Sequence, residues 1–373
     1  MDHIDWILGR GRALGLQGLA DGLGPRLVTA GVPLMRLRFG MRTTHPLTAA
    51  LSYLWEADGT AEVMPAAPRG LEQRAAYIGS PMAYIADTQR PFRRDLRAPL
   101  GNYDHVVLHE LQRRGATDYY GLPLRFVAGQ GGTVIWVCGG AAGFSEDDIA
   151  LLTRLSEVLA PIVEAHANRH LAEAIAHSYL GPRTGQLVLD GRIARGDIEE
   201  IEAAILFSDI RGWTAVNATR TPAEALDIAN SYFEVLSDAV AGAGGEVLKF
   251  TGDGVLALFP SAGDQHAACS AALRAAQGAL ARARDTALPV PFGTGIHYGR
   301  VLYGNVGARD RIDFTVLGQA VNIASRIEAF CGRMEEAILL SEDAATSAGQ
   351  PVRQVGTEVL KGLNSPVPLF APA

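Results

Sequence analysis

Cysteine is scarce in this chain. Its three cysteines, Cys138, Cys269 and Cys331, stand far apart among 373 residues. None belongs to a CxxC pair, so the closely spaced soft ligands of a structural zinc site are absent. This scarcity also argues against a secreted fold held together by disulfides. We therefore expect the three thiols to be small buried side chains in a reducing compartment.

Long apolar runs and an excess of basic residues are missing as well. No stretch approaches the roughly 18 uncharged apolar residues that a membrane helix needs, and the N-terminus, MDHIDWILGRGRALG, lacks the apolar centre of a signal peptide. The formal net charge is -7, whereas nucleic-acid-binding proteins usually present a basic face. The sequence predicts a cytoplasmic protein with no membrane span and no nucleic-acid partner.

Length and patterning predict two domains joined by a helix. We expect an N-terminal helical segment at 1–30, a regulatory α/β domain at 31–164, a helical linker at 165–198 and a second domain at 199–373. The regulatory domain contains strand-like segments at 47–55, 119–127 and 133–139. From Ser145 to about Leu180, apolar residues recur every three or four positions, which predicts a long helix. The Gly-rich segment 181–197 is expected to be a linker with a strand or turn.

The second domain alternates strand-like and helix-like segments. Strands are expected at 203–210, 246–250, 255–259, 290–299 and 301–304, with helices from Thr221 and over 264–283. A helix at 320–330 and strands near 337–340 and 367–369 follow. The β-α-β-β-α-β order predicts an α+β domain with a ferredoxin-like palm.

Two acidic residues stand at informative places. Asp209 ends the apolar strand AILFS, where a carboxylate is unfavourable without a partner. Asp253 stands between Gly252 and Gly254 at a predicted hairpin tip, where glycines let the backbone approach a phosphate closely. In a palm-like sheet these elements are neighbours, and two converging carboxylates suit magnesium, which prefers one or two carboxylates plus phosphate oxygens. Taken singly, Asp253 is equally well explained as a turn former and Asp209 as a helix cap.

Other polar residues suit a phosphorylated ligand. The turn after Asp209 leads into a helix whose first N–H groups face an anion, which makes Gly212, Trp213 and Thr214 candidate substrate-binding residues. Asn322 and Arg326 are four residues apart and share a helix face. Arg presents a fork of donors that fits phosphate. Each feature alone also fits an ordinary loop or a polar helix face.

Two lysines complete the candidate set. Strand alternation predicts that Lys249 faces opposite to its apolar neighbours Leu248 and Phe250, which leaves it a ligand-binding or a solvent-exposed role. Lys361 follows the strand-like segment VGTEVL and would add a second cation for phosphate.

As a set, these residues resemble the class III nucleotidyl cyclases. The motifs FSDIRGWT, GGEVLKFTGDG, GIHYG, FTVLGQAVNIASRIE and LKG occur in the family's order and approximate spacing over about 200–373. The resemblance implies that Asp209 and Asp253 bind two Mg2+ or Mn2+ ions per active site, and we count the adjacent Ile210 with this metal site. It implies that Asn322 and Arg326 position the ribose and stabilise the phosphates in the transition state. Lys361 would hold the terminal phosphates.

The resemblance places Lys249 and Thr315 at the positions that recognise the base. Many members have Asp where this chain has Thr315, and the subgroup with Thr includes bicarbonate-responsive adenylyl cyclases. A Thr hydroxyl accepts from the adenine amino group while Lys249 donates to a ring nitrogen, whereas guanine has a carbonyl in place of that amino group. The pair favours ATP. Because a hydroxyl also donates, a cyclase of GTP or UTP is an alternative.

The implied reaction converts ATP to 3′,5′-cyclic AMP and pyrophosphate by two-metal in-line displacement. Asp209 or water would take the proton of the attacking hydroxyl. In the family, the metal aspartates and the remaining site residues come from different subunits, so an antiparallel homodimer with two sites is expected. The alternative from another class is a catalytically silent cyclase-like module for dimerisation or signalling. Such modules usually lose a metal Asp or the transition-state Arg, and here each position is filled.

The N-terminal half resembles a GAF-type sensor domain, chiefly in its closing segment FSEDDIALLTRLSEVLAPIVEAH. This resemblance implies regulation by a small-molecule effector, and a dimerisation module without a ligand explains the pattern equally well. Two histidine pairs with four-residue spacing, His105 with His109 and His166 with His170, suit haem or a metal. Histidines on solvated helices are the more common explanation.

Overall fold

The structure is a computed structural model and describes residues 2–43, 48–59, 67–68, 70, 73–74, 76–127, 131–361 and 365–373. The chain divides into two compact units, Met1–Ile175 and Ala176–Ala373. Among the helices in the described ranges, none combines the length and the apolar character that crossing a membrane requires.

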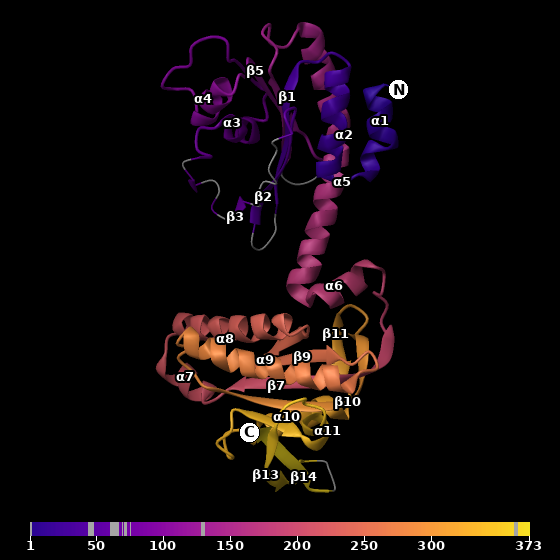
Figure 1. Cartoon of the computed structure of the whole chain (residues 1–373), viewed down its shortest axis with the longest axis vertical. Helices are drawn as coiled ribbons and strands as arrows, with labels where there is room; N and C mark the ends of the chain where they lie inside the picture. Colours follow the sequence, from indigo (N-terminus) through magenta and orange to yellow (C-terminus); the bar gives the residue numbers. More distant parts are fainter. Residues whose placement is uncertain are drawn as a thin grey trace. The chain divides into compact units, whose positions relative to one another are not determined.

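The first unit is built on a six-stranded antiparallel sheet (Figure 1). In sheet order its strands are β3 (Ala67–Pro68), β2 (Thr48–Glu56), β1 (Leu34–Arg42), β6 (Gly132–Cys138), β5 (Asp118–Leu124) and β4 (Phe92–Asp95). Its helical elements are α1 (His3–Gly9), η1 (Gly11–Ala13), α2 (Leu16–Thr29), α3 (Pro81–Thr88), α4 (Val106–Arg113) and α5 (Glu146–Leu180).

Strand alternation gives this sheet two different covered faces. Leu37 and Phe39 of β1 pack in one apolar cluster with residues of α1, α2 and α5. Ile135 and Val137 of β6 pack in a second cluster with residues of α4. Because successive strand residues point to opposite faces, the strands β1, β5 and β6 supply residues to both clusters.

Several predictions for this half are confirmed with small boundary shifts. The three predicted strands are β2, β5 and β6, although Leu47 and Gln130 lie outside the described residues. The long helix is α5, and the Ser145 hydroxyl accepts from the Asp148 backbone N–H at 3.1 Å as an N-cap does. The segment 1–30, expected to be helical, contains α1, η1 and α2, and its apolar residues share the core of the sheet. The domain boundaries themselves stay a prediction.

The second unit contains an eight-stranded sheet, with the path β13-β14-β12-β10-β7-β9-β8 and with β11 paired to β10. Its strands are β7 (Ile198–Ile210), β8 (Glu246–Thr251), β9 (Gly254–Pro260), β10 (Phe292–Gly307), β11 (Ile312–Leu317), β12 (Ile338–Ser341), β13 (Val352–Glu358) and β14 (Val367–Pro372). Its helices are α6 (Pro182–Leu189), α7 (Trp213–Thr219), α8 (Pro222–Gly242), α9 (Gln265–Asp285), α10 (Gln319–Glu328) and α11 (Glu342–Thr346).

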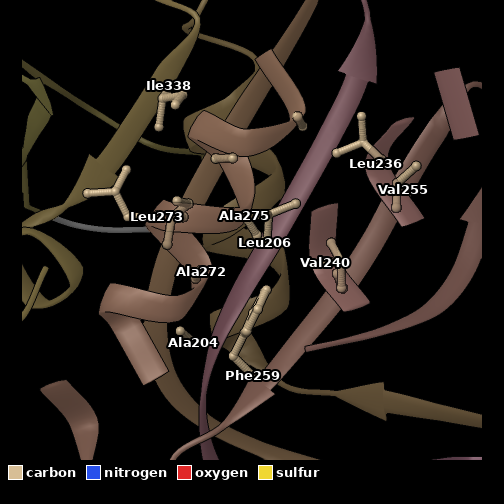
Figure 2. Packing of buried hydrophobic residues seen from close by; sticks show 14 of the residues in the cluster. Ala204, Leu206, Leu236, Val240, Val255, Phe259, Ala272, Leu273, Ala275 and Ile338 are labelled. Carbon is tan, nitrogen blue, oxygen red and sulfur yellow. The ribbon is translucent and has the colours of Figure 1, made fainter. Parts of the chain in front are cut away.

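The centre of this unit has the predicted β-α-β-β-α-β order. β7, β8, β9 and β10 stand in the sheet order β10-β7-β9-β8, all antiparallel to their neighbours. Helices α8 and α9 cover one face of these strands (Figure 1). Figure 2 shows this core, in which Leu206 of β7 lies among side chains such as Leu236, Val255 and Leu273. The helix that begins after Thr221 has the predicted capping box.

Three sequence expectations differ from the structure. The apolar run Leu187–Leu189, expected in a strand or turn, belongs to helix α6, which begins at Pro182, a residue favoured at a first helical position. The two strands expected at 290–299 and 301–304 are one continuous strand, β10. Strand β11 was not expected, because a segment as short as Ile312–Leu317 before a strongly periodic helix is hard to recognise.

Gly295 of β10 marks the closest contact between the sheet and α10. A Cβ atom at this position would lie 2.3 Å from the carbonyl oxygen of Ala324 and 2.5 Å from the backbone nitrogen of Glu328. These are backbone atoms of the α10 region and cannot swing aside as a side chain does. Only glycine lets α10 approach β10 this closely.

We expect Gly295→Ala to destabilise the protein, because the added methyl group must push α10 away from the sheet. Overpacking of this kind costs roughly 1–3 kcal/mol, which corresponds to a Tm loss of at least about 2–4 °C. Thermal denaturation followed by circular dichroism measures the loss. Gly278→Ala on α9 is the control, since the nearest neighbour of its Cβ is 3.9 Å away. Equal Tm changes in the two variants would contradict the close-contact argument.

Candidate active site

The fold brings Asp209 and Asp253 together. Asp209 is the second-last residue of β7 and pairs in register with Gly254, the residue after Asp253. Asp253 lies in the two-residue loop between β8 and β9, where Gly252 has a φ of 68°. That backbone conformation is the one that a type II′ hairpin requires at its first central residue, and glycine adopts it without strain. The hairpin thus places one carboxylate beside the other at the end of β7.

The two carboxylates repel one another. Burial and the neighbouring Asp253 carboxylate raise the pKa of Asp209 to about 6. Glu328 of α10 also belongs to this acidic region, since burial and then the charge of Asp209 raise its pKa to about 7. A divalent cation would remove this repulsion. Within the described ranges no set of three His, Cys, Asp or Glu residues is close enough to hold a metal by itself, but two carboxylates suffice for magnesium when phosphate oxygens complete its shell.

A buried hydrogen-bond network holds the end of β7 in place. The Tyr232 hydroxyl of α8 donates to the Ser208 hydroxyl at 2.9 Å, and Ser208 donates to the Gly293 carbonyl at 2.7 Å. Ser208 and Tyr232 are fully buried. Because Ser208 immediately precedes Asp209, this network fixes the backbone from which the carboxylate projects. Neither residue was expected in the site from the sequence, although a Ser inside an apolar strand is a recognisable signal for a buried partner.

The turn after Asp209 has the predicted strand-to-helix form. Gly212 has a φ of 73° and precedes helix α7. The Arg211 backbone N–H donates to the Pro291 carbonyl at 2.9 Å, so this group is engaged with protein. Trp213 packs against the core beside α8, while Gly212 and Thr214 are exposed. The exposed start of α7 leaves room for a substrate next to Asp209.

Lys249 lies on β8 and is paired to Asp313 of β11, with 2.6 Å between its Nζ and the carboxylate. A register irregularity between Val247 and Lys249 breaks the simple alternation of β8. Leu248 consequently packs in the cluster that contains residues of β11, and Lys249 also reaches β11. The expectation that Lys249 faces opposite to Leu248 is therefore wrong, because it assumed a regular strand.

Thr315 lies two residues after Asp313 on the same strand and is 6% exposed. Residues two apart on a strand share a face. The Lys249–Asp313 ion pair thus brings the lysine to the strand that carries Thr315. Asp313 was not selected from the sequence, since its partner lies 64 residues away.

Asn322 and Arg326 share helix α10, as their spacing predicts. Ala324 and Ile327 between and beside them are buried, whereas Asn322 is exposed and Arg326 is partly exposed. Lys361 is exposed just beyond β13. In the part of the chain that the structure describes, no hydrogen bond or ion pair joins these three residues, Lys249 or Thr315 to Asp209 or Asp253.

Among the described residues, neither histidine pair belongs to a group of three or more possible metal ligands. His105 is the N-cap of α4, and its Nδ1 accepts from the Val107 backbone N–H at 3.2 Å. His109 contacts the Gly101 carbonyl through Nε2 at 3.2 Å. Their spacing thus has a structural explanation.

Comparison with known proteins agrees with this geometry. Residues 198–362 match the model of the adenylate and guanylate cyclase catalytic domain family. An adenylate cyclase of Anabaena cylindrica is 38% identical over 176 residues, which are 43% of this chain and 35% of that protein. Adenylate cyclase 1 of Rhizobium meliloti is 32% identical over 180 residues, 45% of this chain and 27% of that protein. This chain thus spans about a third or less of these two relatives.

The segment that matches the adenylate and guanylate cyclase catalytic domain thus lies in the second unit, and it includes Asp209 and Asp253. Its relatives include adenylate cyclases. A bacterial light-regulated adenylyl cyclase of known structure is similar over 76% of this chain and 92% of its own, with a TM-score of 0.51 and 20% identity. That likeness shows a shared fold, and its extent exceeds the second unit alone.

Repulsion between the carboxylates gives a stability prediction. The pKa of Asp209 in the folded protein lies above its ordinary value of about 4. Asp209 therefore favours folding below pH ~4, and this contribution is lost as pH rises through about 6. At pH 7.5 without metal, we expect Asp209→Asn to raise Tm, by roughly 2–4 °C for each kcal/mol of repulsion removed. The variant should also lose the Tm increase that Mg2+ or Mn2+ gives the original protein.

The control is Asp227→Asn, at an exposed position of α8. It should leave both the metal-free Tm and the metal-dependent increase unchanged. An Asp209→Asn protein that Mn2+ still stabilises fully would contradict the assignment of this carboxylate to a metal site.

Proposed function

We propose that this protein is an adenylate cyclase that converts ATP to 3′,5′-cyclic AMP and pyrophosphate. The observation that supports this most directly is the pair Asp209 and Asp253, whose mutual repulsion at the end of β7 calls for a cation. The match of residues 198–362 to the cyclase catalytic domain and the two relatives named adenylate cyclase support the same activity.

Asp209 and Asp253, with the adjacent Ile210, would hold two Mg2+ or Mn2+ ions. When bound, such ions lower the pKa of an attacking hydroxyl and neutralise charge on a triphosphate. The carboxylates fix where the α-phosphate lies, and Ser208 and Tyr232 keep the strand end rigid. The ribose 3′ oxygen forms a bond to the α-phosphorus as the bond to the pyrophosphate oxygen breaks. The hydroxyl proton leaves to Asp209 or to water.

The remaining residues bind the rest of the nucleotide. Arg326 offers a planar fork of N–H donors for the charge that builds on the phosphates, and Asn322 orients the ribose. Lys361 holds the terminal phosphates, while the turn at Gly212, Trp213 and Thr214, of which Gly212 and Thr214 are exposed, contacts the triphosphate beside the carboxylates.

These residues require a second copy of the chain. Asn322 and Arg326 are on the outward side of α10, and no contact in the described residues connects them to the carboxylates. A homodimer in which each subunit supplies Asp209 and Asp253 to one site and Asn322 and Arg326 to the other would complete two equivalent sites.

ATP is the proposed substrate because of Lys249 and Thr315. Thr315 is nearly buried and Lys249 is held beside its strand by Asp313. The lysine donates to a ring nitrogen of the base, and the hydroxyl accepts from the adenine amino group. Competition among the four nucleoside triphosphates tests this choice.

The first unit is proposed as a GAF-like regulatory domain. Its six-stranded antiparallel sheet with helices on both faces and the long helix α5 that follows it are compatible with a sensor that precedes a catalytic domain. Such a domain implies a small-molecule effector.

The full-length protein with Mn-ATP should form cyclic AMP, measured by chromatography. Asp253→Ala should lower kcat by about 100-fold or more, because one carboxylate cannot hold both ions. The exposed Asp227→Asn should retain the original rate. Absence of cyclic AMP at high enzyme concentration would refute the proposed activity.

A mixing experiment tests the shared site. Asp253→Ala and Arg326→Ala should each be inactive, and a re-equilibrated equal mixture should regain about a quarter of the original rate, because half of the dimers are mixed and each has one intact site of two. A mixture that stays inactive would mean that each subunit supplies its own complete site.

The Lys249–Asp313 ion pair gives a separate prediction. Its partners have side chains 30% and 60% exposed, so the pair should contribute little stability and act chiefly by orienting Lys249. We expect Asp313→Asn to raise the KM for ATP roughly 2- to 5-fold at similar kcat. Asp310→Asn is the control, at an exposed position before β11. If both variants show the same KM, Asp313 does not orient the lysine.

A further inference from the structure

Strand β1 of the first unit has an unusual pattern. Arg36 and Arg38 alternate with Leu37 and Phe39. In a sheet with one solvated face, the arginines would simply point into water. Here Leu37 and Phe39 pack against the helices of the α1, α2 and α5 side. The arginines consequently point to the opposite face, which the region of α3 and α4 covers.

A cavity of about 270 Å³ lies on this covered face. Arg36 and Arg38 line it, together with apolar side chains such as Met82, Ile135 and Val137. The volume corresponds to a molecule of roughly ten non-hydrogen atoms, at the small end of ligand sites. Its lining therefore combines an apolar wall with guanidinium groups.

The first arginine already has its counter-charge. Arg36 is ion-paired with Glu56, a carboxylate that is 6% exposed. Glu56 also accepts a hydrogen bond from Arg114 at 2.8 Å. This buried carboxylate is thus shared between two guanidinium groups, which already compensate its single negative charge.

Arg38 lacks such a partner. Its Nη2 donates to the Ser52 hydroxyl at 2.9 Å, and its buried Nε has no hydrogen-bond partner among the described residues. Within the described ranges no carboxylate forms an ion pair with it. Burial lowers the pKa of Arg38, with Arg36 contributing in the same direction. A guanidinium in this position keeps its charge, so the cost of burying it is not offset by the protein.

The geometry points to a ligand that supplies the missing charge. We propose that the cavity between the sheet and the α3–α4 region binds a small organic monocarboxylate, whose carboxylate pairs with Arg38 and whose apolar body packs on Met82, Ile135 and Val137. Arg presents two parallel N–H donors that fit a planar carboxylate. The adjacent Tyr119 is buried and its pKa is raised by that burial, so its hydroxyl stays a neutral donor.

The site disfavours inorganic phosphate. The apolar side chains of Met82, Ile135 and Val137 would have no partner in phosphate, whereas the body of an organic acid would cover them. The proposal concerns the first unit, and its tests measure binding, so they do not depend on the proposed cyclase activity.

Isothermal titration calorimetry on the full-length protein tests the proposal with acid and amide pairs of equal shape. The probes are benzoate with benzamide, and 3-methylbutanoate with 3-methylbutanamide. At least one acid should bind 10-fold or more tightly than its amide, and inorganic phosphate should bind more weakly than that acid. If no acid exceeds its amide, or if phosphate binds most tightly, the proposal is wrong.

Variants locate the site. Arg38→Met removes the charge but keeps an unbranched side chain, and it should abolish the preference for the acid. Arg90→Met, at an exposed position after α3, is the control and should bind like the original protein. An Arg38→Met protein that retains full acid binding would overturn the site.

The Tm of each variant shows whether a loss of binding in Arg38→Met comes from a folding defect. Because Arg38→Met removes a partly buried charge that has no ion-pair partner among the described residues, its ligand-free Tm should equal or exceed that of the original protein. The acid should raise the Tm of the original protein and of Arg90→Met but not that of Arg38→Met. A lower ligand-free Tm in Arg38→Met would show that the protein already compensates the charge, and that result would also overturn the proposal.

Discussion

The repulsion between Asp209 and Asp253 is the constraint on which the second unit depends. Two carboxylates placed side by side and partly buried are unfavourable, as the raised pKa of Asp209 shows. The surrounding structure is organised to hold them there nonetheless. A tight hairpin presents Asp253, and the buried Tyr232–Ser208–Gly293 network fixes the strand that ends in Asp209. The stability of the rest of the domain must offset this repulsion. Carboxylates that are held together in this way are typical of a site that binds a cation.

The candidate site residues were easier to recognise from the sequence than the helices and strands between them. Asp209 and Asp253 stand out because a carboxylate at the end of an apolar strand and another between two glycines both break the local pattern. The central strands and helices follow from periodicity. Lys249 was predicted on the correct strand, but the expected direction of its side chain relative to Leu248 was wrong. One irregular residue pairing changes the direction of a side chain, and the amino-acid composition does not reveal it.

Other features could not be predicted because they depend on contacts between distant segments. The Lys249–Asp313 pair joins residues 64 positions apart, and Glu328 acquires its raised pKa from carboxylates on other elements. Helix α6 was missed because eight residues contain too few turns to show a helical period. The same limit applies to the arginines of β1. Their alternation with apolar residues predicts a solvated face, and only the packing of the α3–α4 region shows that this face is covered.

Both units therefore contain a charge that their own residues do not balance. In the second unit the excess is negative, and in the first it is the guanidinium of Arg38. An unbalanced, partly buried charge lowers the stability of the folded protein. A ligand of opposite charge that binds the folded state must therefore raise that stability. Effects of this kind are local, and they leave the apolar cores of the two units to specify the fold. The uncompensated charges, at Asp209 and Asp253 in the second unit and at Arg38 in the first, are therefore where each unit is expected to bind a ligand.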